Sequence, residues 1–301
     1  MICWIALLGL GACASGVAQD LHDAEQDVME GRADQAIAEL KAFPNSPQAH
    51  LLLCRAWLSK LHGSEAAAEC RIAIKTGLGE NSGAQDWAGR AFGMQAEHAG
   101  PFSGLKLAGE VRSAFQAAYT LNKHNPAATN DLGEFYVGAP SLVGGGLDKA
   151  SALADEVQTT LPEIAHRLRA LVAQKHGDMG TAEREFLAAT QVAQSPGTLV
   201  DLALFYVRQH LLEKAVATAQ RSIQANRDLG ADLFDAASTL NDAHQPAKAL
   251  PVLRLYLARG KKSDQAPAFR AHTLIGRILA AEGDKTGARQ EFQSALALAA
   301  D

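Results

Sequence analysis

A pattern of small and bulky residues recurs through the C-terminal half of the chain with a period of roughly 34 residues. Its reference points are four residues at turns between apolar segments: Gly177, His210, His244 and Gly283. Ala or Gly lies seven positions before each turn, and Ala lies five positions after it. Small residues at these places let two antiparallel helices approach closely, and Phe186, Leu253 and Phe292 would fill the gap to the next pair. The pattern therefore predicts a series of helical hairpins, each packed only on its neighbours.

This alternation of small and large residues resembles the tetratricopeptide repeat (TPR) family. The likeness extends from about Asp20 to the C-terminus and would give roughly eight repeats. It is degenerate over residues 19–126, where Lys75 replaces an expected small residue, and regular over 163–301. Residues 127–162 resemble a TPR hairpin with a Gly-rich insert. The resemblance implies an all-α, right-handed superhelical solenoid with one concave face.

The composition agrees with packed helices and limits the classes of function. The chain is rich in Ala, which has the highest helix propensity, and only 6% of its residues are aromatic. Its 28 basic and 33 acidic residues give a net charge of −5, which disfavours a broad nucleic-acid-binding surface. We therefore expect no nucleic-acid partner.

The first 18 residues have the layout of a secretory signal peptide. Met1 to Leu10 are apolar and small residues follow, although the usual basic segment is missing. The stretch from Leu10 to Cys13 resembles the bacterial lipobox, which would make Cys13 a lipidation site. Cleavage after Ala14 or Ala18 is the alternative, and a first helix buried in the fold is a third interpretation. We expect an exported protein, periplasmic or anchored to the outer membrane, with a cytoplasmic location as the second choice.

Only two cysteines, Cys54 and Cys70, lie outside this N-terminal segment. They form no CxxC motif or metal-ligand cluster, so we expect no zinc site. They flank a turn predicted at Gly63, on two helices that should be antiparallel. An oxidising compartment would allow a disulfide, but the helical phase favours free buried thiols.

The insert at residues 138–147 is the most unusual local sequence. From Tyr136 to Ala150 it resembles an Ala-Pro…Gly-Gly…Lys-Ala stretch of some exported bacterial TPR proteins. The amides of Gly144, Gly145 and Gly146 precede a helix and could hold an anion. No Gly-Lys-Ser/Thr sequence follows, so glycines that permit a tight connection are the favoured interpretation.

No catalytic signature is present. The sequence lacks HExxH, G-x-S-x-G, a Walker loop and DxDxDG, and its ten histidines are scattered. We therefore expect neither enzymatic activity nor a cofactor or metal ion.

The TPR resemblance also implies a binding groove, because ligands of this family usually lie against the first helix of each hairpin. The repeat spacing assigns nine residues of this chain to such a groove: Arg167, Leu171, Gln174, Lys175, Leu204, Arg208, Phe234, Asn241 and Arg277. In the N-terminal half, Trp57 and Phe92 occupy equivalent positions in their hairpins. A groove that mixes Arg, Lys, Gln and Asn with Leu and Phe suits an extended peptide or protein segment. The charged residues Arg167, Lys175, Arg208 and Arg277 are expected to form one basic side of it.

Three hypotheses follow from the sequence. The first is a non-catalytic protein–protein interaction scaffold of the bacterial cell envelope. The second is an envelope protein that binds a solute or glycan, which would need exposed Trp and Tyr platforms. The third is an enzyme with a site at the Gly-rich insert.

Overall fold

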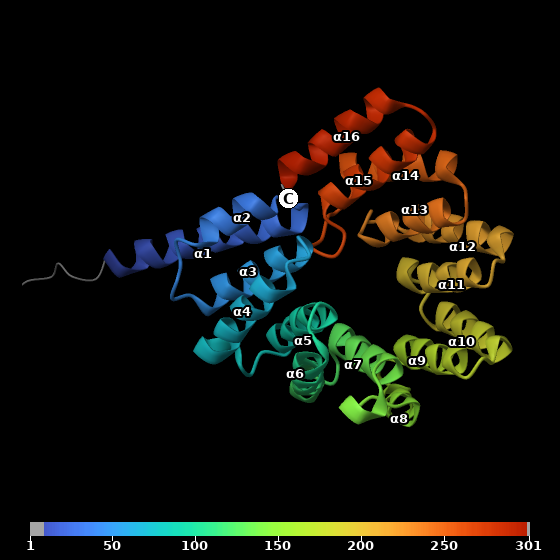
Figure 1. The fold of residues 1–301 in the computed structure, drawn as a ribbon, viewed down its shortest axis with the longest axis horizontal. Helices are drawn as coiled ribbons and strands as arrows, with labels where there is room; N and C mark the ends of the chain where they lie inside the picture. Colours follow the sequence, from blue (N-terminus) through green and yellow to red (C-terminus); the bar gives the residue numbers. More distant parts are fainter. Residues whose placement is uncertain (1–8, 300–301) are drawn as a thin grey trace, which may run out of the picture.

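The computed structural model describes residues 9–299, and they form sixteen α-helices and no strand (Figure 1). The helices pair into eight antiparallel hairpins. The first helices are α1 (Gly9–Glu30), α3 (Pro47–Ser59), α5 (Ser82–Glu97), α7 (Pro126–Gly138), α9 (Pro162–Lys175), α11 (Pro196–Arg208), α13 (Asp232–Asp242) and α15 (Ala268–Ala281). The second helices are α2 (Ala33–Leu40), α4 (Gly63–Ala73), α6 (Pro101–Leu121), α8 (Leu147–Val157), α10 (Met179–Val192), α12 (Leu212–Ala225), α14 (Pro246–Arg259) and α16 (Lys285–Leu298). The predicted all-α superhelical solenoid is confirmed.

The hairpin turns of the C-terminal half lie where the repeat places them. Gly177, His210, His244 and Gly283 all have positive φ, between 57° and 89°. Histidine adopts this left-handed conformation more readily than most residues, which suits it to such turns. In the second hairpin the left-handed residue is Leu61, with φ 66°, and not the predicted Gly63. Gly63 begins α4 so close to α5 that a Cβ would lie 2.7 Å from the backbone nitrogen of Gln95.

Small residues occur where the paired helices approach most closely, as the pattern predicts. Ala170, Ala203 and Ala237 are fully buried or nearly so. A Cβ on Gly276 would lie 2.6 Å from the ring of Phe292 across the last hairpin. The same spacing also aligns three histidine–glutamate pairs between first and second helices, with Nδ1 to Oε2 distances of 2.6–2.7 Å. These pairs are His50–Glu69, His166–Glu185 and His272–Glu291.

Two irregular segments interrupt the N-terminal half. Lys75 lies in η1 (Ile74–Leu78), a π-helical segment in which Gly77 leaves the helical conformation. The Gly-rich insert contains η2 (Ser141–Val143), a single 3₁₀ turn. The repeat pattern therefore fails in the sequence at the same places where the helices become irregular.

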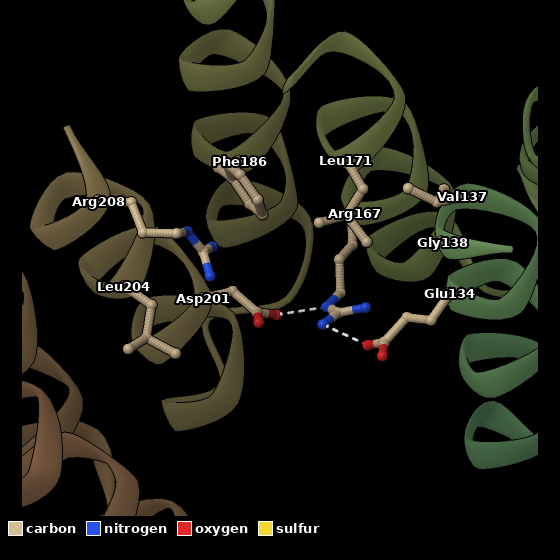
Figure 2. A pocket seen from close by; sticks show the side chains of 9 residues that line it. All are labelled: Glu134, Val137, Gly138, Arg167, Leu171, Phe186, Asp201, Leu204 and Arg208. Atoms are coloured by element: carbon tan, nitrogen blue, oxygen red, sulfur yellow. Dashed lines mark hydrogen bonds and ion pairs between the residues drawn. The ribbon is translucent and has the colours of Figure 1, made fainter. Parts of the chain in front are cut away.

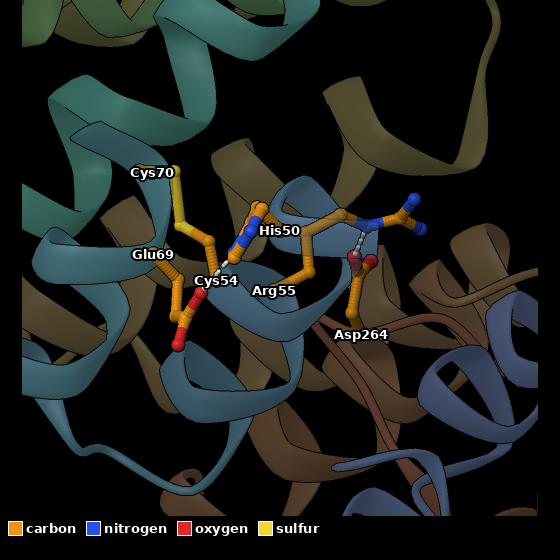
Figure 3. The surroundings of a disulfide bond; sticks show 6 residues. All are labelled: His50, Cys54, Arg55, Glu69, Cys70 and Asp264. Carbon is orange, nitrogen blue, oxygen red and sulfur yellow. Dashed lines mark hydrogen bonds and ion pairs between the residues drawn. A yellow bond between two sulfur atoms is a disulfide. The ribbon is translucent and has the colours of Figure 1, made fainter. Parts of the chain in front are cut away.

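The first and last hairpins meet, which the sequence did not predict. The loop between α14 and α15 (residues 260–267) extends to the N-terminal hairpins, where Asp264 forms an ion pair with Arg55 of α3 at 2.6 Å (Figures 1 and 3). The turn at Gly31 also abuts this loop, because a Cβ there would lie 2.7 Å from Cβ of Pro267. The expectation that hairpins contact only their neighbours is therefore wrong: the solenoid curves into a closed ring.

Cys54 and Cys70 form a disulfide between α3 and α4, and the expectation of free thiols is wrong (Figure 3). Their Cα atoms are 5.3 Å apart, within the range that a disulfide requires. The error came from helical phase, because the turn lies at Leu61 and not at Gly63, which changes where the two cysteines face.

The predicted signal peptide lies partly outside the described residues. From Gly9 onward the chain is helical, and α1 continues through residue 18 to Glu30, with Ala24 and Val28 packed against α2 and α3. Cleavage and the lipidation of Cys13 stay predictions. No helix within residues 9–299 is both long and apolar enough to cross a bilayer.

Candidate binding site on the concave face

The first helices line the inside of the ring from α3 onward, and the second helices lie outside (Figure 1). Because a hairpin repeats roughly every 34 residues, residues with that spacing stack along the inner face. Asp131, Arg167, Asp201 and Asp235 form such a series on α7, α9, α11 and α13. We call this series the concave ladder.

Arg167 is the central cation of the concave ladder. Its guanidinium lies 2.9 Å from Asp201 on the next hairpin and 2.7 Å from Glu134 on the preceding one (Figure 2). It also donates a 2.6 Å hydrogen bond to Asn130. Burial alone would lower the pKa of Arg167, but Asp201 and Glu134 together raise it above the usual arginine value. Arg167 therefore links three successive hairpins.

A pocket of about 270 Å³ opens beside this ion-pair network, between α7, α9 and α11 (Figure 2). Its walls are partly apolar and partly charged: Glu134, Val137, Gly138, Arg167, Leu171, Phe186, Asp201, Leu204 and Arg208. Among the described residues, no carboxylate lies within ion-pair distance of Arg208. Partial desolvation by the pocket lowers the pKa of Arg208, the nearby charge of Asp201 opposes this, and that of Arg167 adds to it. Arg208 stays charged near neutral pH. The pocket therefore presents one available cation next to an internally neutralised one.

The next stretch of the concave face is acidic. Asp235 is open to the groove, yet the enclosing walls and the nearby Asp232 raise its pKa to about 6, while Arg270 opposes the shift. Burial raises the pKa of Asp232 as well, and the charge of Asp201 adds to the effect. The alternation of opposite charges along the concave ladder therefore ends here, and an acidic surface follows the Arg208 pocket.

In the N-terminal half, Arg90 joins two aspartates. Its distances to Asp86 and Asp131 are 3.1 Å and 2.6 Å. Burial, and then the charge of Asp131, raises the pKa of Asp86 to about 7, although Arg90 opposes this. One carboxylate oxygen of Asp86 is buried without a hydrogen-bond partner.

Trp57 and Trp87 each contact a lysine or arginine side chain. Trp87 has Arg55 at 5.5 Å and Arg90 at 4.6 Å from its ring centroid. Trp57 has Lys60 at 5.7 Å and His62 at 5.3 Å. Neither ring offers the bare platform on which a sugar would stack, so the described residues give no support to the glycan hypothesis.

Four of the nine predicted groove residues line the Arg208 pocket: Arg167, Leu171, Leu204 and Arg208. The structure does not bring the other five into it: Gln174, Lys175, Phe234, Asn241 and Arg277. Phe234 belongs to the core, where it is 6% exposed and packs on Tyr256. Lys175 and Arg277 are exposed elsewhere on α9 and α15, so these four cations do not form one basic side of this pocket. The sequence analysis missed the acidic partners Glu134 and Asp201, although Arg167, Asp201 and Asp235 share one spacing of 34 residues.

The Gly-rich insert forms no anion site. The amides of Gly144, Gly145 and Gly146 donate to the carbonyls of residues 141, 140 and 136 at 2.8–3.1 Å. A Cβ on Gly145 would lie 1.9 Å from the carbonyl oxygen of Ala139, and Lys149 donates to the carbonyl of Gly144. The glycines therefore allow close backbone packing, and no cluster of potential metal ligands occurs among the described residues.

Comparisons with known proteins identify the fold. No family model and no curated protein matches the sequence. Among solved structures, yeast Tom70 is similar with a TM-score of 0.54 at 15% identity, over 89% of this chain and 55% of Tom70. A thermophilic TPR protein of Thermus thermophilus gives 0.47 at 17% identity, over 74% of this chain and 98% of its own. A TPR protein of Parabacteroides merdae has a TM-score of 0.43 at 14% identity, over 84% of this chain and 93% of its own length. The likeness to Tom70 establishes a TPR-type superhelical fold.

Proposed function

We propose that this chain is a non-catalytic scaffold that binds an extended segment of a partner protein along its concave face. The observation that carries the proposal is the Arg208 pocket. It combines a cation that has no ion-pair partner among the described residues with apolar walls from Leu171, Leu204 and Phe186. A carboxylate of the peptide would bind Arg208, and an apolar side chain next to it would enter the pocket.

The neighbouring charges specify the partner further. Arg167 is held by Glu134 and Asp201, so it orients the pocket walls and is not available to a ligand. Asp232 and Asp235 repel each other on the next hairpin, and a basic side chain there would relieve this repulsion. We therefore expect a peptide with an acidic group followed by a basic group, bound with salt-sensitive affinity.

We also propose that the protein works in an oxidising cell-envelope compartment. The signal-like layout of residues 1–18 supports export, and the disulfide between Cys54 and Cys70 fits an oxidising environment. The mature chain should begin at Cys13 or between Ser15 and Gln19. Intact-mass measurement of protein from the native envelope decides this, and a Met1 terminus recovered from cytosol would contradict export. A diacylated Cys13 would support the lipoprotein version.

Capture of partners on the purified chain tests the binding proposal. Proteins retained from an envelope extract should be lost when Arg208→Glu is used, because the substitution reverses the charge of the pocket. Arg277→Glu is the matched control, since it makes the same charge change on α15, outside the pocket. Equal retention by both variants at low and high salt would exclude the Arg208 pocket as the site.

A further inference from the structure

The loop of residues 260–267 is anchored at both ends to its own hairpins. The backbone amide of Lys261 donates to the carbonyl of Leu229 at 2.8 Å. At the other end, the hydroxyl of Tyr256 donates to the carbonyl of Ala266, and Arg270 donates to that of Gln265 at 2.6 Å. These contacts place a short non-helical segment at the inner edge of the ring, between its two ends.

The tip of this loop contacts the N-terminal hairpins through a nearly buried ion pair. Arg55 and Asp264 are 209 residues apart in sequence, and their side chains are only 11% and 8% exposed (Figure 3). Glu25 of α1 binds the same guanidinium at 2.7 Å. Pro267 is buried and abuts Gly31, the turn between α1 and α2. The loop therefore contacts α3 through an ion pair and the α1–α2 turn through close packing.

Arg55 is a residue that a ligand in the groove would meet. It lies on the first helix α3, and its guanidinium and that of Arg90 both contact the ring of Trp87. Arg90 in turn forms an ion pair with Asp131 of the concave ladder. Gln265 of the loop lines a concave cavity of about 690 Å³, together with Arg90 and Asp131. The loop thus places Gln265 against this cavity and the adjacent carboxylate of Asp264 against Arg55, as a bound peptide with an aspartate would.

We infer that the concave face at Arg55 is a docking site for an extended peptide that carries an aspartate, and that residues 260–267 occupy this site in cis and close the ring. This inference rests on the proposed function, because it assigns a second subsite and its regulation to the same groove. A partner that reaches the N-terminal half of the groove must displace Asp264 from Arg55. A tethered segment competes at an effective concentration on the order of millimolar, so the closed ring excludes peptides that bind this site weakly.

The test uses Asp264→Asn in the full chain, with two readouts. Lys261 and Lys262 in the loop are sites for trypsin, and the rate of cleavage there should rise at least tenfold when the ion pair is removed. A fluorescent peptide with the sequence of residues 259–268 should then bind at least tenfold more tightly than it binds the unchanged chain. The same peptide with Asn at the Asp264 position should lose this affinity, and so should the chain with Arg55→Met added to Asp264→Asn.

Two controls separate ring opening from general loosening. Asp228→Asn changes an exposed aspartate of the α12–α13 loop and should alter neither readout. Asp264→Glu, which keeps the carboxylate opposite Arg55, should retain slow cleavage. An unchanged cleavage rate in Asp264→Asn, faster cleavage in Asp228→Asn as well, or cleavage without tighter peptide binding would each overturn the inference. Because these readouts do not involve Arg208, they leave the test of the Arg208 pocket independent.

Discussion

The two halves of the ring, α1–α8 and α9–α16, hold their hairpins together by different means. In the C-terminal half, small residues face bulky ones at a constant spacing, and each turn has a left-handed residue at the expected place. The N-terminal half departs from this pattern at Lys75 and at the Gly-rich insert, and it contains a disulfide and the Arg90 ion pairs. Ion pairs between hairpins occur in both halves, as at Arg167 and Asp201, but among the described residues the disulfide lies in the irregular half.

This difference has a physical basis. A regular hairpin buries its apolar faces against identical neighbours, so each interface contributes a similar free energy. At η1 and η2 the repeat packing between helices is interrupted. The packing there depends on individual residues, such as Gly145, which lies against the backbone of Ala139. Substitutions in the two halves should therefore differ in kind as well as in size.

Removal of the disulfide should have the largest effect on stability. Cys54→Ala with Cys70→Ala releases a loop closed over a sequence separation of 16 and should lower the free energy of unfolding by about 3 kcal/mol. Denaturant titration with and without reducing agent measures this. Reducing agent should lower the stability of the unchanged chain and leave the variant unaffected; equal stability of all four samples would show that the N-terminal half does not depend on this link.

Overpacking tests the C-terminal half. Gly276→Leu places a side chain against the ring of Phe292 and should cost about 2 kcal/mol. Gly93→Leu on α5 is the matched control, because a Cβ there meets no heavy atom within 4 Å. Thermal melts should show a loss for the first variant and none for the second, and two neutral variants would mean that the repeat phase is wrong.

Asp86 should make the N-terminal half sensitive to pH. Its pKa is raised to about 7 in the folded chain, so the folded state binds a proton that the unfolded state releases near pH 4. The stability from this group is complete below about pH 4 and is lost as the pH rises through 7. Relative to Asp86→Asn, the unchanged chain should lose about 1.5 kcal/mol between pH 5.5 and 7. Parallel pH profiles of the two proteins would contradict this.

The smallest expected difference concerns helix capping. Asn125 caps α7 by accepting hydrogen bonds from the amides of Ala127 and Ala128, and it also donates to Ser82 at the start of α5. Asp178 caps α10 by accepting hydrogen bonds from the amide and the hydroxyl of Thr181 on the same helix. Asn125→Ala should therefore cost about 1 kcal/mol, and Asp178→Ala should cost less. Urea titration compares them, and the reverse order would show that the N-terminal hairpins do not need this additional link.

Sequence reasoning recovered the contacts that repeat with a fixed period. Turns at His210 and His244, and the close approach at Gly276, follow from spacing alone. The pairs His50–Glu69, His166–Glu185 and His272–Glu291 repeat as well. The sequence analysis missed them because it considered how the histidines are scattered along the chain and not their positions within the repeat. Asp264 could not be paired with Arg55 in advance, because that contact depends on the accumulated curvature of all the intervening hairpins.

The contact of the loop with α3 also bears on how such a gene can change. An open array of hairpins tolerates duplication or deletion of one unit, because only the two adjacent interfaces must be rebuilt. In a closed ring, one added hairpin would rotate Asp264 away from Arg55 and move Pro267 off the turn at Gly31. A change in the number of hairpins would therefore break the closure as a whole, and chains with seven or nine hairpins would have to do without it.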